Sequence, residues 1–128
     1  MTIEAIRTDA APAAIGPYSQ GVRAGDLVFF SGQIPLRPET GEMIDGDIAA
    51  QTEQVMKNME AALAGADLGF DRVVKTTIYL TDLGNFSTVN EIYGRYFDQT
   101  PPARATVEVS ALPKGAEVEI EWVAYCGR

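Results

Sequence analysis

The most informative features of this 128-residue chain are what it lacks: histidine, a second cysteine and any long apolar run. Without histidine, the Ser-His and Cys-His nucleophile pairs, a histidine general base and His-ligated metal sites are excluded. The single cysteine, Cys126, cannot form an internal disulfide, which fits a reducing compartment. No apolar stretch reaches the roughly 18 residues of a membrane span, and the N-terminus lacks the apolar core of a signal peptide. These absences predict a cytoplasmic protein that has no metal site and does not enter a membrane.

Positive charge is also scarce. Ten Lys and Arg against eighteen Asp and Glu give a formal net charge of −8. A field of this sign repels phosphate backbones, so the composition disfavours a nucleic-acid partner. The chain has no internal repeat, linker or low-complexity tract, and its length suits one core. We therefore expect a single domain over residues 1–128.

The periodicity of apolar residues predicts an α+β fold with the order ββαβαββ. The expected elements are strands at 2–7, 27–35, 73–80, 104–109 and 117–125, a helix from Asp47 to about Gly65, and a helix from about Phe86 to Pro101. The last two strands read as an antiparallel hairpin, and the strand-helix-strand crossovers imply parallel pairing. We expect a two-layer structure with a mixed sheet, both helices on one face, and an oligomer covering the other face.

Alternation along the expected hairpin places its ionic and polar side chains on one face. These are Arg104, Thr106 and Glu108 on one strand and Glu117, Glu119 and Glu121 on the other. Carboxylates two residues apart on a strand lie roughly 6 to 7 Å from each other, close enough to raise a pKa where water is scarce. This face is either a solvated surface, the commoner outcome for a run of charges, or part of a site.

Arg104 follows the stiff segment 101–103, which fixes where its guanidinium enters the sheet. A guanidinium held in this way suits bidentate capture of a small carboxylate. The alternative is a surface ion pair with Glu108 or Glu121, and the sequence does not decide between the two.

The expected hairpin register separates Arg104 from Glu119. If the turn centres on 113–114, Arg104 lies opposite Val123, and Glu119 lies about 13 Å away along the hairpin. One chain would then not bring both side chains to one small ligand. A site that used both would have to be completed by a neighbouring subunit.

Three further segments contain candidates for contact with a ligand. Ser31-Gly32 interrupts the most apolar strand, which indicates a bulge or a close approach of a ligand to the backbone. Asn90 lies on the apolar face of the second helix, where a buried amide would tie a loop backbone or contact a ligand. Tyr18 follows Gly16-Pro17 and would either pack against its neighbours or form a hydrogen-bonding lid.

Six ordered blocks between residues 11 and 125 have a familiar pattern. They are APAAIGPYSQ at 11–20, SGQIP at 31–35, VKTT at 74–77 with TDL at 81–83, VN at 89–90, PAR at 102–104 and VEIE at 118–121. Each block alone is weak, but together they closely resemble the reactive intermediate deaminase family in its RidA (YjgF-like) branch. The resemblance covers nearly the whole chain.

The resemblance implies a chorismate-mutase-like fold that assembles as a homotrimer with a site in each cleft between subunits. It also implies hydrolysis of 2-iminoacids such as 2-iminobutanoate and 2-iminopropanoate, or their enamine tautomers, to 2-ketoacids and ammonia. Such intermediates are released by pyridoxal-phosphate-dependent dehydratases. The deaminase itself would need no cofactor, because imines already hydrolyse in water and orientation plus one base suffices.

The resemblance assigns roles to individual residues. Arg104 matches the arginine that holds the substrate carboxylate, and Glu119 matches the glutamate that positions water. Tyr18, Ser31, Gly32, Asn90 and Thr106 match further site positions. Tyr18 would help to close the cleft, and Thr106 stands where some members carry a cysteine. Glu117 stands where relatives are often basic, and we expect it to make the site more acidic.

Two other functions fit the same residues. A catalytically silent trimer that binds 2-ketoacids or other small carboxylates would use the same Arg104. Some members of the family have been described as ribonucleases or translation inhibitors, but the negative charge and the missing histidine count against that function here.

Overall fold

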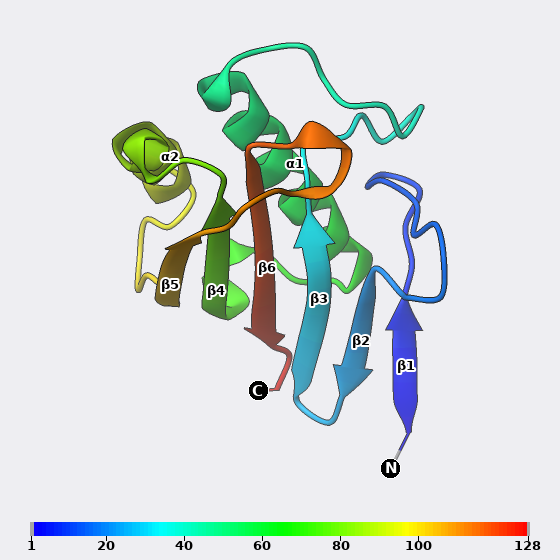
Figure 1. Cartoon of the computed structure of the whole chain (residues 1–128). Coiled ribbons are helices and arrows are strands. Elements are labelled where there is room, and N and C mark those ends of the chain that lie inside the picture. Colours follow the sequence, from blue (N-terminus) through cyan, green and yellow to red (C-terminus); the bar gives the residue numbers. More distant parts are fainter. Residues whose placement is uncertain (1, 128) are drawn as a thin grey trace.

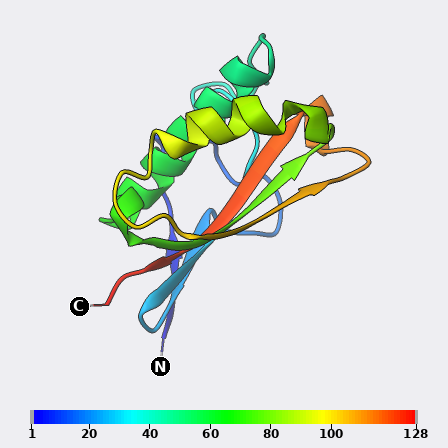
Figure 2. The same cartoon turned by 90° about the vertical axis from the view of Figure 1, so that its left-hand side faces the viewer.

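The computed structural model describes residues 2–127 and contains a six-stranded mixed sheet with two α-helices on one face (Figures 1 and 2). The elements in chain order are β1 (Ile3–Ile6), β2 (Gly21–Ala24), β3 (Leu27–Gln33), α1 (Ile48–Gly65), β4 (Val73–Leu80), α2 (Phe86–Gly94), β5 (Ala103–Glu108) and β6 (Val118–Tyr125). Short 3₁₀ turns lie at Phe70–Arg72, Leu83–Asn85 and Pro113–Gly115. The expected α+β class, with both helices on one side of the sheet, is confirmed.

The sequence prediction missed β2, so the order is βββαβαββ and not ββαβαββ. β2 has four residues, begins with Gly21, and pairs antiparallel with both β1 and β3. Its turn into β3 uses Gly25 at a φ of 63°, a conformation that glycine adopts without strain. The strand was missed because it is short and because its pairing partners on both sides, rather than its own composition, hold it extended.

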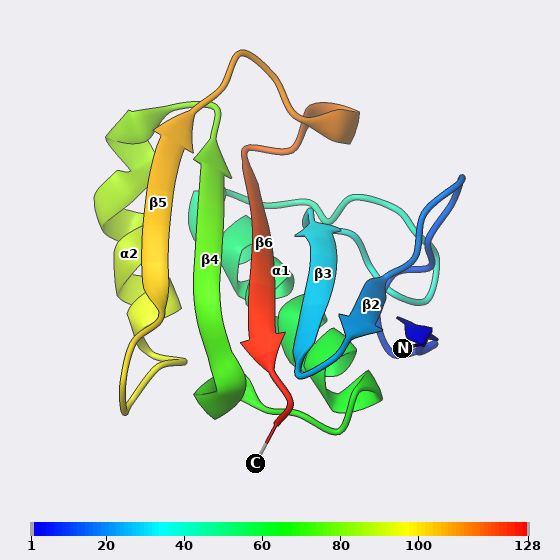
Figure 3. The same ribbon diagram turned by 90° about the horizontal axis from the view of Figure 1, so that it is seen from below.

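β5 and β6 do not form the expected hairpin. The strand order is β1-β2-β3-β6-β4-β5, and Figure 3 shows β4 lying between the two. β5 pairs in parallel with β4, whereas β6 is antiparallel to both β3 and β4. The crossover through α2 returns the chain beside β4, and β6 takes the central place because its alternate residues are fully apolar. The register partner of Arg104 is therefore Thr76 and not Val123.

The core fills the space between the helices and the inner face of the sheet. Its largest fully buried members are Met56, Met59 and Leu63 from α1, Ile78 and Leu80 from β4, and Ile120 and Trp122 from β6. Asp47 caps α1, since its Oδ1 accepts the Ala50 N–H at 3.0 Å. α2 ends at Gly94, well before the expected stop at Pro101.

The opposite face of the sheet carries no helix (Figure 2). Large apolar side chains stand exposed on it, namely Ile3, Leu27, Phe29 and Val107. Apolar side chains left exposed on an uncovered sheet face favour an interaction site there. Neither helix within residues 2–127 combines the length and the apolar character that crossing a membrane would need.

Candidate functional site

Arg104 lies on the edge strand β5, and its guanidinium turns toward the helix layer. Its Nη1 donates to Oδ1 of Asn90 at 2.7 Å. Its Cζ lies 5.5 Å from the ring centroid of Phe86 and 5.2 Å from that of Tyr93. The three α2 residues occupy positions i, i+4 and i+7, which form one stripe along a helix. We call these three residues the α2 cradle.

The alternative ion pairs of Arg104, with Glu108 or with Glu121, do not form among residues 2–127. Oε1 of Glu108 accepts instead from the Leu83 backbone N–H at 2.9 Å. Glu121 alternates with the buried Ile120 and Trp122, so it points to the open face of the sheet and away from α2. The guanidinium therefore has no carboxylate partner within the described chain.

Asn90 differs from its expected place in the core. Its side chain is exposed, because α2 lies at the margin of the helix layer and this side of the helix faces the edge strand. Its carbonyl oxygen orients Arg104 and does not tie a loop backbone. The helical period correctly placed Asn90 on the apolar stripe of this helix, but the period alone does not show which part of the stripe is buried.

Thr106 lies two residues after Arg104 on the same side of β5. Its register partner is Ile78, a core residue. Its hydroxyl oxygen is buried and has no hydrogen-bond partner among residues 2–127. A buried hydroxyl without a partner costs free energy, so this atom is available to a group outside the chain.

Glu119 points to the open face of the sheet, because its neighbours Val118 and Ile120 are buried under the helices. It is half-buried, and its carboxylate lies directly over Gly32. A Cβ atom at position 32 would collide with Oε2 of Glu119. Only glycine at position 32 therefore leaves room for the carboxylate in this position. A register shift between Phe30 and Gln33 marks a β-bulge at the same point.

Burial raises the pKa of Glu119 above its ordinary value, and the negative charge of Glu121 raises it further. Tyr79 is the register partner of Glu119 on β4. Burial also raises the pKa of the Tyr79 hydroxyl, and the negative charges of Glu121 and Glu119 raise it further. The open face thus combines a carboxylate that takes up a proton easily with a phenol that stays protonated.

Ser31 joins the bulge to the N-terminal loop. Its Oγ donates to the Ser19 carbonyl at 2.6 Å, and its N–H donates to the Gln20 carbonyl at 3.0 Å. The buried Gln20 side chain holds the loop by accepting from the Thr8 N–H and donating to the Pro12 carbonyl. Gln20 is an organising residue that the sequence analysis missed, although it belongs to the first family-like block.

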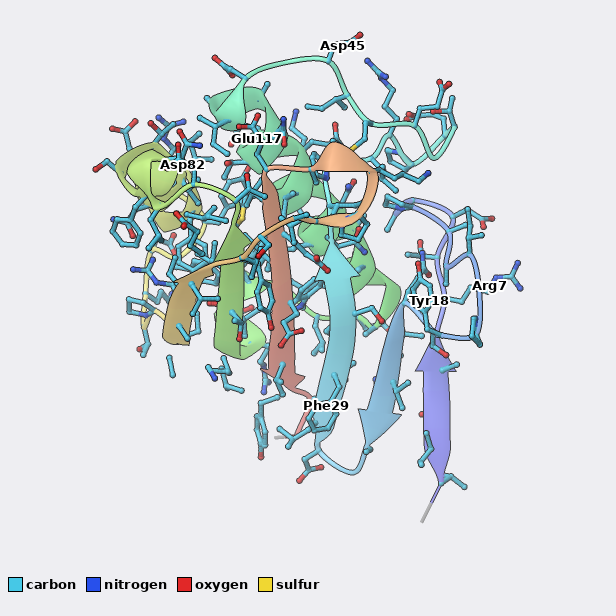
Figure 4. All side chains as sticks on the ribbon, viewed as in Figure 1. Arg7, Tyr18, Phe29, Asp45, Asp82 and Glu117 are labelled. Carbon is cyan, nitrogen blue, oxygen red and sulfur yellow. The ribbon has the colours of Figure 1, made fainter. Side chains whose placement is uncertain are left out.

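Tyr18 projects from this loop and is 54% exposed. It lines a hollow of about 290 Å³ together with Arg7 and neighbouring loop residues. Figure 4 places Tyr18 beside β1 and β2, whereas β5, which carries Arg104, is the opposite edge of the sheet. The loop therefore presents the tyrosine outward, far from the Arg104 of its own chain.

Glu117 faces α1 and not Glu119. Its Oε2 accepts from Nε2 of Gln51 at 3.0 Å, and its backbone N–H donates to Oε1 of the same side chain at 2.9 Å. Figure 4 shows Glu117 where the chain enters β6, close to α1. The predicted single ionic face is wrong, because the residues of β5 face α2, Glu117 faces α1, and only Glu119 and Glu121 face outward.

One chain holds two partial sites on opposite faces of its sheet. Arg104, Asn90 and Thr106 lie together on the α2 side, and Glu119 lies over Gly32 on the open face. β4 separates the two strands that carry Arg104 and Glu119. The expected separation of these two side chains is therefore present, although its cause is the sheet and not the length of a hairpin. Among residues 2–127, no group of His, Cys, Asp or Glu could hold a metal ion.

Comparisons with known proteins agree on one family. A family model described as Endoribonuclease L-PSP matches residues 8–126. Protein DfrA of Myxococcus xanthus is 60% identical over 126 residues, which are 97% of this chain and 96% of that protein. The 2-iminobutanoate/2-iminopropanoate deaminase of Homo sapiens is 48% identical over 122 residues, 95% of this chain and 89% of that protein.

A solved structure shows the same fold at full length. The protein YyfA of the conserved Rid family from Yersinia pestis superposes with a TM-score of 0.94 and 52% sequence identity, covering 97% of this chain and 99% of that chain. The predicted resemblance is thus confirmed at the level of the family. The chain belongs to the Rid (YjgF/RidA) family, whose members include proteins named 2-iminobutanoate/2-iminopropanoate deaminase.

Proposed function

We propose that this protein hydrolyses small 2-iminoacids, such as 2-iminobutanoate and 2-iminopropanoate, to 2-ketoacids and ammonium. The observation that carries the proposal is the pair of complementary partial sites. Arg104 is a fixed cation with free N–H donors, and Glu119 is a carboxylate with a raised pKa. The 48% identity to a human protein named for this reaction supports the substrate class.

The two partial sites meet only if a second copy contributes one of them. We propose a homotrimer in which Arg104 of one copy faces Glu119 of the partner subunit. The exposed apolar residues of the open face, among them Phe29 and Val107, support this assembly because contact with another copy would bury them. Tyr18 would then close the cleft from its loop beside β1 and β2.

In this arrangement the guanidinium of Arg104 binds the substrate carboxylate through two N–H groups. Glu119 accepts a proton from water as the water oxygen bonds to the iminium carbon. Glu119 returns that proton to nitrogen, the C–N bond breaks, and the hydroxyl proton passes to the departing ammonia. The products are the 2-ketoacid and ammonium. Orientation and one general base need to supply only about 10²- to 10⁴-fold, because imines also hydrolyse unaided.

The test generates 2-iminobutanoate with an amino-acid oxidase, traps it with semicarbazide, and measures whether the protein suppresses the trapped product. We expect suppression by the wild-type chain and its loss in both Arg104→Ala and Glu119→Ala. Retention of full turnover by Arg104→Ala would refute the role of the guanidinium. The mass of the assembly in solution, measured by light scattering, confirms that each variant is still assembled.

Mixing the two inactive variants tests whether the site lies between copies. If the copies exchange after mild dissociation, about a quarter of the clefts in mixed trimers pair an intact Arg104 with an intact Glu119, and activity returns in that proportion. If both residues act within one chain, no mixture recovers activity.

A carboxylate-binding protein without turnover is the second candidate, because the α2 cradle prepares Arg104 for a carboxylate whether or not a reaction follows. Binding of 2-ketobutanoate by a correctly assembled protein that does not suppress the trapped imine would favour it. An RNA digestion assay with Arg104→Ala as control addresses the ribonuclease function named by the family model. We expect no digestion, since the net charge of −8 opposes RNA binding.

A further inference from the structure

The α2 cradle suggests a role for two aromatic residues that the family resemblance did not assign. An arginine side chain on an exposed edge strand would normally sample many rotamers. Here the guanidinium has three partners on one stripe of α2: the rings of Phe86 and Tyr93 and the amide oxygen of Asn90. The cradle thus restricts both the position and the plane of the guanidinium.

The cradle is itself anchored in the core. Tyr93 is 4% exposed, and its hydroxyl shares a buried hydrogen bond of 2.7 Å with Oγ1 of Thr76. Thr76 is the register partner of Arg104 on the neighbouring strand. Thr76 therefore holds both groups in place. The backbone of Arg104 pairs beside it in the sheet, and the Tyr93 ring is held by the hydrogen bond between the two hydroxyl groups.

The cradle leaves most of the guanidinium free. A guanidinium has five N–H donors, and within residues 2–127 only Nη1 donates to a protein acceptor, Oδ1 of Asn90. Arg104 also lines a hollow of about 330 Å³ with Tyr93, Pro101 and Pro102. Donors that are oriented but unused are what a bidentate carboxylate requires.

We propose that Phe86 and Tyr93 are positioning residues that hold Arg104 in its carboxylate-binding orientation. Loss of either ring would weaken substrate binding while the chemical step at Glu119 stays nearly unchanged. This inference rests on the proposed function for its activity readout. Binding of a carboxylate and the order of the Arg104 side chain test it without any turnover.

Phe86→Leu is the most informative variant, because Phe86 is 38% exposed and its replacement spares the core. We expect its KM for 2-iminobutanoate and its Kd for 2-ketobutanoate to rise about threefold to tenfold, with kcat changed less than about twofold. The Nε–Hε signal of Arg104 in ¹⁵N relaxation measurements should show a lower order parameter than in the wild type.

Tyr93 is tested in two steps. Tyr93→Phe keeps the ring and removes the hydrogen bond to Thr76, so we expect the smaller rise in Kd. Tyr93→Leu removes both, so we expect the larger rise; if it fails to fold, Phe86→Leu and Tyr93→Phe still decide the question. Tyr96→Leu is the matched control, since Tyr96 packs on Phe70 and bonds to Glu53.

Each outcome bears on the inference separately from the proposed function. An unchanged Kd and an unchanged Arg104 order parameter in Phe86→Leu and Tyr93→Phe overturn the positioning role. So does an equal effect in Tyr96→Leu, which would reveal a general structural loss. Failure of the wild type to bind 2-ketobutanoate overturns it as well. Ring-dependent binding without imine hydrolysis supports the positioning role and refutes the proposed deaminase.

Discussion

The two faces of the sheet place Arg104 and Glu119 in opposite electrostatic environments. On the α2 side, Arg104 is surrounded by aromatic rings and an amide oxygen, which favour the cation and fix its direction. On the open face, Glu119 is crowded over Gly32 and lies near Glu121, so its anion is disfavoured. The proposed function assigns substrate recognition to the first face and proton transfer to the second, and β4 separates the two strands within one chain.

The largest effect that distinguishes the two faces is expected for Arg104→Lys. An ammonium keeps the charge but cannot offer two parallel N–H donors to a carboxylate or stack in the same way on the rings of the cradle. We expect kcat/KM for 2-iminobutanoate to fall about 100-fold or more. The semicarbazide assay measures it, and activity within a few fold of wild type would mean that charge alone suffices.

Gly32→Ala is expected to displace the Glu119 carboxylate on the open face of the sheet. The added Cβ would occupy the place of Oε2 of Glu119, so the carboxylate must move. A displacement of about 1 Å in a reacting group costs on the order of 100-fold in rate. We expect this loss in kcat, with Kd for 2-ketobutanoate nearly unchanged. Gly94→Ala is the matched control, because a Cβ there meets nothing within 4 Å.

Glu121→Gln should shift the pH dependence of the reaction and not its maximum. In the proposed reaction Glu119 must be ionised to accept a proton from water, so kcat/KM is expected to fall as the pH drops through its raised pKa. Removing the neighbouring negative charge lowers that pKa. The acidic limb of the profile should therefore move to lower pH, as measured by initial rates at several pH values. A shift to higher pH would contradict the assignment.

The smallest expected effect is on stability, in Glu119→Gln. Because the pKa of Glu119 is raised on folding, the folded state binds its proton more tightly than the unfolded state. The resulting stabilisation is present at low pH and is lost as the pH rises through the raised pKa. Glu119→Gln should therefore raise the melting temperature by a few degrees at pH 8 and leave it unchanged near pH 4. An equal change at both pH values would show that ionisation is not the cause.

The sequence by itself determined the local features of this protein. The 3.6-residue period predicted the start of α1 near Asp47 and placed Asn90 on the apolar stripe of α2. The β-branched run 73–80 gave β4, and the alternation around Glu119 gave the outward direction of that side chain. The interruption at Ser31-Gly32 indicated either a bulge or a close approach of a ligand, and the structure contains the bulge. These features depend on neighbours within one or two turns, so the pattern of the chain contains them.

The tertiary structure alone decided which elements lie side by side. The last two strands read as a hairpin in the sequence. In the structure the crossover through α2 places β5 beside β4, and the apolar residues of β6 are buried at the centre of the sheet, so β4 lies between β5 and β6. That insertion, with the side-chain direction on each strand, put Arg104 and Glu119 on opposite faces. The contacts of Glu117 with Gln51, 66 residues apart, arose in the same way. Such pairings result from competition among all strands and helices for one core, and no local pattern records that outcome.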